Sequence, residues 1–126
     1  MIIRKKQIKF KNKSYHLIVS TYLNGRLKIN LENKHENYEV TIDIPDVCLY
    51  DGNILLDPAI INSGILNVLK KIKIIKSIVS VINYNYVDIP VATLNMGKLR
   101  EYDAVGVKNH FEKLQKHFCE VLDYEK

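Results

Sequence analysis

Residues 15–31 read YHLIVSTYLNGRLKINL, and this stretch contains the pattern that decides the fold. As a strand, residues 15–23 would place five side chains on one face: Tyr15, Leu17, Val19, Thr21 and Leu23. Residues 27–31 alternate strictly between apolar and polar side chains. Asn24 and Gly25 lie between the two segments and form the strongest short hairpin signal, because both positions accept positive φ. The stretch therefore predicts an antiparallel hairpin that buries one face.

Further alternating segments lie on both sides of this hairpin. Residues 38–44, YEVTIDI, alternate in the same way until a proline ends the predicted strand. Residues 47–56 predict a looser hairpin that turns at residues 51–52. Before the first hairpin, the IKFK of residues 8–11 fits an edge strand, whose lysines discourage unwanted pairing.

The second half of the chain mixes helical and extended patterns. A helix can start at residues 57–58 or at residues 62–63, where capping residues precede apolar positions with helical spacing. Part of the β-branched run 72–82 and the segment 87–95 predict strands. Pro90 favours an edge position or a bulge for the second of these strands.

The C-terminal segment predicts an amphipathic helix. Its apolar residues recur at steps of 4, 3, 4 and 3 and form one stripe: Val107, Phe111, Leu114, Phe118 and Val121. Asp103 precedes the run and is a natural N-cap, while Met96–Tyr102 predicts a short helical turn before it. Gly106 permits a close approach in the first turn. If the stripe is buried, Phe111→Ala costs about 3 kcal/mol or more.

Together these patterns predict one α+β domain over residues 1–126: an antiparallel meander of about 5–7 strands, with a central helix and the C-terminal amphipathic helix packed on one face. A chain of this length can bury a core without disulfides or a metal.

Cys48 and Cys119 lie apart in apolar contexts, so we expect buried, reduced thiols. A disulfide or a reactive thiol is the alternative.

The charge distribution is uneven along the chain. The formal net charge is +5, and residues 1–34 hold nine Lys or Arg and one acid. Residues 35–69 hold six acids and no Lys or Arg. This polarity can steer a charged partner, or it can place strands of opposite charge side by side.

The apolar runs favour an intracellular protein. None reaches the roughly 18 residues of a membrane span. The opening MIIRKKQIKFK has charges without an apolar core behind them, so we expect no signal peptide. We therefore expect a cytoplasmic protein without membrane contact.

The sequence contains no pattern typical of a catalytic or metal site. His110 and His117 are seven residues apart, which is about 10 Å along a helix and too far for one metal ion. The chain has neither a nucleophile elbow nor a phosphate-binding glycine loop. We therefore expect a non-catalytic protein with no metal and no cofactor.

Two groups of residues are candidates for binding. The first is the basic N-terminal tract, which could neutralise phosphates or, together with the outward face of the first hairpin, contact a protein: Arg4, Lys5, Lys6, Lys9, Lys11 and Lys13. Scarce arginine counts against base recognition, although three tyrosines could stack on single strands: Tyr22, Tyr84 and Tyr86.

The second group is a ligand pocket at the start of the terminal helix: Asn95, Arg100, Tyr102, Asp103 and His110. A helix N-terminus attracts anions, but Asp103 there would repel them, and a capping and salt-bridge group is the structural alternative.

Two stretches carry a resemblance to known proteins. LDPAIINSGILNVL at residues 56–69 and IPVATLNMGKLREYDAVGVKNHF at residues 89–111 resemble a family of small bacterial proteins often carried on mobile elements and prophages. The resemblance covers roughly residues 38–118 and implies a small accessory protein, such as an inhibitor of a host defence system, with no catalytic residues. We therefore expect protein–protein interaction, with nucleic-acid binding and small-ligand binding as alternatives, and exposed edge strands favour a homodimer.

Overall fold

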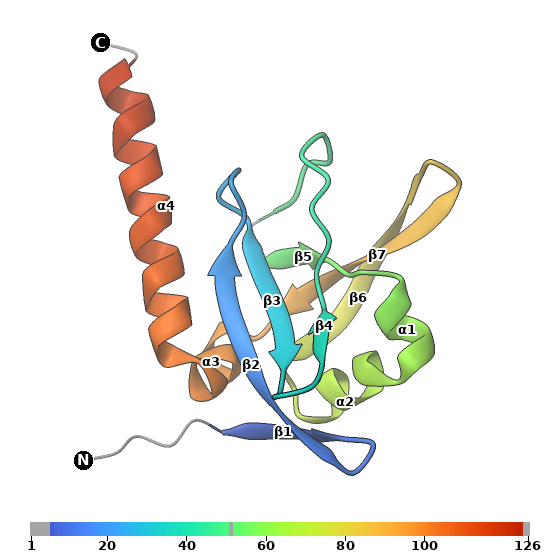
Figure 1. Cartoon of the computed structure of the whole chain (residues 1–126). Coiled ribbons are helices and arrows are strands. Elements are labelled where there is room, and N and C mark those ends of the chain that lie inside the picture. The colour runs from blue at the N-terminus through green and yellow to red at the C-terminus, as the bar shows by residue number, and fades with distance from the viewer. Residues whose placement is uncertain (1–5, 51, 125–126) are drawn as a thin grey trace, which may run out of the picture.

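The computed structural model describes residues 6–50 and 52–124, with side chains as far as residue 116, and contains two antiparallel sheets (Figure 1). The first sheet has the order β1-β2-β3-β4: β1 (Gln7–Phe10), β2 (Lys13–Thr21), β3 (Leu27–Glu32) and β4 (Asn37–Glu39). The second has the order β5-β7-β6: β5 (Asn53–Leu55), β6 (Ile75–Tyr84) and β7 (Val87–Leu94). Four helices complete the fold: α1 (Ala59–Ser63), α2 (Ile65–Lys71), α3 (Met96–Tyr102) and α4 (Ala104–Tyr124).

The α+β class is confirmed, and the strands divide between two sheets rather than forming one meander. The chain leaves the first sheet directly after β4. The Val40 amide donates to the Ile29 carbonyl at 2.9 Å, and the Ile42 amide donates to the Leu55 carbonyl at 3.1 Å. The predicted strand 38–44 is therefore short, because its middle crosses from one sheet to the other.

The predicted first hairpin forms. Val19 pairs with Ile29, and the inward side chains of both strands are buried. The Tyr22 amide donates to the Arg26 carbonyl at 2.8 Å across the turn, and Gly25 has a φ of 89°. This is a three-residue connection with glycine in the left-handed position, rather than the two-residue turn that Asn-Gly most often makes.

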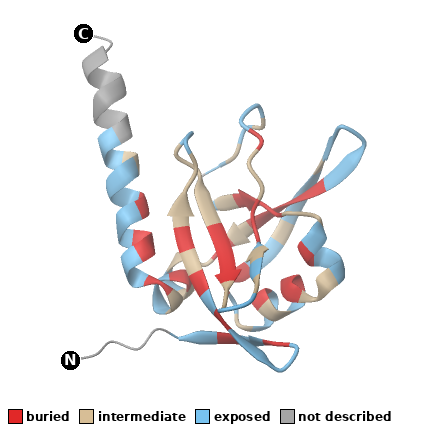
Figure 2. Ribbon diagram, in the orientation of Figure 1, coloured by how far each residue is buried: buried red, intermediate tan, exposed pale blue. Residues whose placement is uncertain are grey.

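The main core lies between the two sheets and against α1 and α2, where Figure 2 shows most of the buried segments. A smaller cluster on the other face of the second sheet joins Ile44 to β5 and β7. Because β7 pairs with β5 on one edge and with β6 on the other, it is the middle strand of its sheet, and the expected edge position for Pro90 is wrong. The alternative of a bulge has support nearby, since β6 has a register shift between Ile78 and Ser80, opposite the residues that follow Pro90. Pro90 lies just beyond the β5 pairing, where its carbonyl accepts from the Leu56 amide at 2.9 Å, so its missing N–H lies outside that ladder.

The expected central helix consists of two short helices that meet at Gly64, whose φ is 90°. Both predicted starts exist. The Asp57 carboxylate accepts from the Ala59 amide at 3.0 Å, and the Ser63 hydroxyl accepts from the Ile65 amide at 3.3 Å.

The first turns of α4 pack against the sheet. Gly106, Val107 and His110 are buried, Leu114 is half-buried, and Phe111 is 42% exposed. The covered positions 106, 110 and 114 recur every four residues, so Phe111 lies beside the covered face of the helix. Figure 1 shows that α4 runs along β2 and then continues past the end of the strand. The expected burial of Phe111 is therefore wrong, and the side chains of the last two stripe positions lie outside the described residues.

The thiol of Cys48 is exposed, so its expected burial is wrong. Its neighbours Val47 and Leu49 turn toward the smaller cluster, which points Cys48 outward. The Cys119 side chain lies outside the described residues.

Candidate functional site

Asp103 joins the start of α4 to β2. Its side chain is 3% exposed. One carboxylate oxygen accepts from the Gly106 amide at 3.1 Å, which is the predicted N-cap, and the other accepts from the Val19 amide at 2.9 Å. Among the described residues, β1 pairs with β2 only as far as His16, and the Asp103 carboxylate takes the Val19 amide beyond that point. These bonds give the carboxylate a structural role.

The other members of the predicted ligand pocket have separate contacts within the fold. Asn95 caps α3 by accepting from the Lys98 amide at 3.2 Å. The Arg100 guanidinium lies 5.8 Å from the Phe111 ring centre, and the Lys6 ammonium lies 5.6 Å from the Tyr102 ring centre. The arrangement favours the structural alternative for these residues.

His110 faces a different hollow, of about 540 Å³, which lies between the first hairpin, the loop before β5 and the start of α4. Its Nδ1 lies 2.8 Å from the Thr21 hydroxyl. Burial, and then the charge of Lys113, lower the pKa of His110 below its ordinary value. Among the described residues that line this hollow, none is a carboxylate.

No metal or membrane feature was found in the described part of the chain. Residues 6–50 and 52–124 contain no group of three His, Cys, Asp or Glu that could hold a metal ion. Within the same ranges, no helix has both the length and the apolar character that a bilayer crossing requires.

The structure divides the basic N-terminal tract into paired and open lysines. Arg4 and Lys5 lie outside the described residues. The Lys6 ammonium lies 3.4 Å from Glu101, and Lys13 pairs with Glu36, which raises the pKa of Lys13. Two further members of the tract, Lys9 and Lys11, are exposed on β1 and the turn after it.

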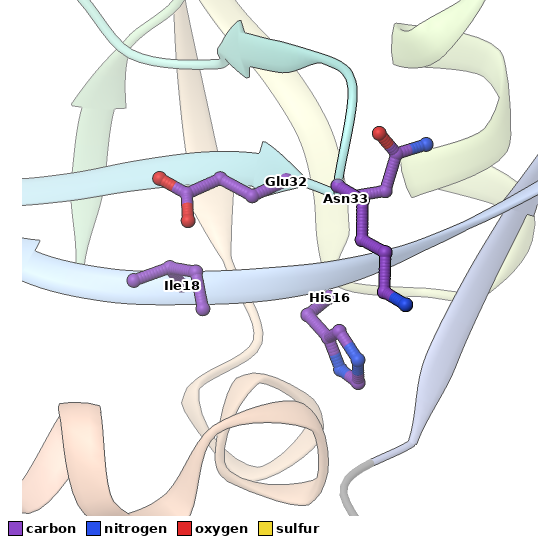
Figure 3. A pocket seen from close by; sticks show the side chains of 5 residues that line it. His16, Ile18, Glu32 and Asn33 are labelled. Atoms are coloured by element: carbon purple, nitrogen blue, oxygen red, sulfur yellow. The ribbon is translucent and has the colours of Figure 1, made fainter.

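The outer face of the first sheet contains a hollow of about 470 Å³ beside this tract. Its lining comes from β2, β3 and the turn that follows: His16, Ile18, Glu32, Asn33 and Lys34. Figure 3 shows the His16 ring and the Glu32 carboxylate on neighbouring strands, with Asn33 at the end of β3. In Figure 1 none of the drawn helices covers the front of β2 and β3. We call this surface the outer sheet face.

Asn30 lies on the same face and has an unusual environment. It is directly opposite Ile18 in the strand register and is 8% exposed. Its amide nitrogen donates to Asn37 at 3.1 Å, whereas its carbonyl oxygen has no hydrogen-bond partner within the described structure. Buried polar atoms nearly always have a partner, but this oxygen is itself buried, so a donor from outside the chain reaches it only after the side chain rotates.

Sequence reasoning placed the binding surface on the basic N-terminal tract and the outward face of the first hairpin, but it did not name the individual residues of that face as a site. The residues it missed are His16, Asn30, Glu32 and Lys34. The period-two pattern places three of them on one side of their strands. The hollow itself depends on the pairing of β2 with β3 and on the turn after β3.

The tyrosines that could stack on nucleic-acid bases do not join the lysine tract. Tyr84 and Tyr86 lie at the β6–β7 hairpin in the second sheet. The Tyr22 hydroxyl lies 3.0 Å from that of Thr41, and Lys28 lies 5.5 Å from the Tyr22 ring centre. The structure therefore separates the candidate stacking residues from the candidate phosphate contacts.

Comparison with known proteins found no matching family model, no matching curated protein and no matching solved structure. The resemblance to small mobile-element proteins therefore stays a prediction.

Proposed function

We propose that this chain is a small non-catalytic protein that acts by binding an acidic segment of another protein on the outer sheet face. The observation that carries the proposal is the hollow beside open lysines on a sheet face that none of the described helices covers. Lys34 lines the hollow, and Lys9 lies on the same side of β1, because Gln7 and Lys9 alternate with buried residues.

The hollow combines charges of both signs with an apolar floor. Glu32 and Lys34 are ionic, His16 and Asn33 can hydrogen-bond, and Ile18 supplies apolar surface. Protein partners match such mixed surfaces, because their side chains carry both charges and apolar groups. A peptide amide or a lysine could also donate to the orphan Asn30 oxygen, with a small rotation of that side chain.

Nucleic acid is the second candidate, because nine Lys or Arg lie in residues 1–34. One observation favours a protein instead. The exposed rings of Tyr84 and Tyr86 lie at the hairpin of the other sheet, apart from the lysines of the N-terminal tract. Single-strand binding ordinarily combines both features in one groove.

The biological context rests on the family resemblance alone. It supports a cytoplasmic accessory protein of a mobile element or phage, with a host defence component as the partner class. The fold adds the surface through which such a partner would bind.

The test compares two double variants with the same change in charge. Lys9→Glu with Lys34→Glu alters the outer sheet face, and Lys70→Glu with Lys71→Glu alters exposed lysines of α2. Each isotope-labelled protein is titrated with a glutamate-rich peptide and with a single-stranded oligonucleotide, and amide shifts are followed by NMR.

We expect the peptide to shift amides of the outer sheet face, and we expect the first double variant alone to abolish this shift. Equal losses in both variants would mean that binding follows net charge only. Preferential, steeply salt-dependent binding of the oligonucleotide would favour the nucleic-acid function instead.

A further inference from the structure

The edge strands of the two sheets differ greatly in length and in how far their backbone groups are protected from pairing with another strand. Three edge strands are short: β1 has four residues, and β4 and β5 have three each. β5 is also approached by the chain after β4, through the Ile42–Leu55 bond and a bridge between Thr41 and Leu56. β6 has ten residues and, among the described residues, pairs on one side only, with β7.

An open edge offers backbone N–H and C=O groups to any other strand, and natural proteins usually protect it with charge. β1 follows this rule through Lys9 and through the lysines on either side of the strand, Lys6 and Lys11. β6 does not, because its sequence IKSIVSVINY has a single charge, at Lys76. From Ser77 to Val87 the chain has no charged residue at all.

Two exposed side chains of β6 are apolar and β-branched. Val79 is 52% exposed and Val81 is 58% exposed. Tyr84 and Tyr86 extend the exposed surface into the turn. Large apolar side chains that cluster on the surface are typical of an interaction site, whereas single ones are ordinary.

The geometry of β6 is most regular in its second half. Register shifts lie between Ile75 and Ser77 and between Ile78 and Ser80. Pairing with β7 is continuous from Ser80 to Tyr84. Figure 1 shows the β6–β7 hairpin projecting from the body on the side away from α4, so a second chain can reach it.

We propose that β6 is a homodimer interface, in which β6 of a second copy pairs antiparallel with it across a two-fold axis within Ser80–Tyr84. Two three-stranded sheets then form one continuous sheet of six strands. A two-fold axis places the same patch on both sides of an interface, so the patch must be self-complementary.

Charge explains why a second copy fits this edge. Each chain has a formal net charge of +5, so two copies repel each other over most of their surface. An axis within Ser80–Tyr84 brings uncharged β-branched strands together. The nearest charges, at Lys76 and Asp88, lie outside the paired segment. The β6 strand of a second copy is therefore an extended partner that carries no charge in the paired segment.

The test measures self-association by sedimentation velocity over a concentration series. Val81→Lys places a charge of the same sign from each copy beside the axis, on a side chain whose exposure lets the monomer fold. Val105→Lys is the matched control, because Val105 is an equally exposed valine (63%) on α4. Circular dichroism and the melting temperature check that both variants fold.

We expect the wild type and Val105→Lys to dimerise, and we expect Val81→Lys to weaken the dimer by about 100-fold or more, because like charges juxtaposed at an interface are strongly unfavourable. In the wild type, amide hydrogen exchange within Ser80–Tyr84 should slow as concentration rises. A wild type that stays monomeric, a Val81→Lys dimer of unchanged strength, or exchange that is independent of concentration would overturn the proposal.

The dimer interface is independent of the proposed function. Val81→Lys should still bind the acidic peptide, and the Lys9 and Lys34 double variant should still dimerise. Failure of one inference therefore leaves the other intact.

Discussion

Replacing Gly106 by alanine tests the contact between α4 and β2. A Cβ atom at this position would lie 2.2 Å from an Asp103 carboxylate oxygen and 2.6 Å from the Val19 carbonyl oxygen. Neither atom can move without a loss of stability. The Val19 carbonyl oxygen belongs to the strand backbone, and the Asp103 oxygen accepts a hydrogen bond from the Val19 amide. The helix must move away from the strand.

The size of the effect follows from what that movement breaks. Helix propensity alone would make alanine more stable than glycine by about 1 kcal/mol. The bond from the Val19 amide to an ionised carboxylate contributes about 1.5–3 kcal/mol. Moving the helix also loosens Val107, which is 1% exposed, and loss of one buried methyl group typically costs about 0.5–1.5 kcal/mol. We expect a net loss of about 1–3.5 kcal/mol in the free energy of unfolding.

The assay is urea unfolding followed by circular dichroism, with Gly97→Ala as the matched control. Gly97 is a helical glycine of α3, and a Cβ there would lie 3.4 Å from the Asn95 side-chain oxygen. We expect this control to match or exceed wild-type stability by up to about 1 kcal/mol. A Gly106→Ala protein as stable as the control would refute the reasoning.

Three more predictions concern the same region of the fold. Asp103→Ala removes the N-cap and the bond to β2, and we expect it to lower the free energy of unfolding by about 3 kcal/mol, measured by urea titration. Phe111→Ala should cost less than about 2 kcal/mol, because the ring is 42% exposed, and a melting curve that shows a larger loss would mean that α4 packs more closely. Burial, and then Lys113, lower the pKa of His110 below 6.5, so the unfolded chain takes up the proton first as the pH falls. The free energy of unfolding should therefore decrease as the pH drops below about 6.5, and His110→Gln should flatten this dependence when unfolding is measured at several pH values.

The sequence by itself determined the local features of this protein. The alternation in residues 15–31 places Leu17, Ile29 and Leu31 in the core, and Gly25 takes the left-handed turn position. Asp103 caps α4 as its position before the amphipathic run predicts. These features depend on side-chain period and on contacts within a few residues, which a sequence pattern contains directly.

Only the tertiary structure decided the features that depend on distant residues. The bond between Asp103 and Val19 joins positions 84 apart, and it places α4 along β2 so that Phe111 stays exposed. The crossing at Val40 divides the strands into two sheets, which leaves β6 as an open edge and separates the lysines from Tyr84. Periodicity says which face of a strand is buried, but not which strand lies beside it, because that choice is made by the packing of the whole core.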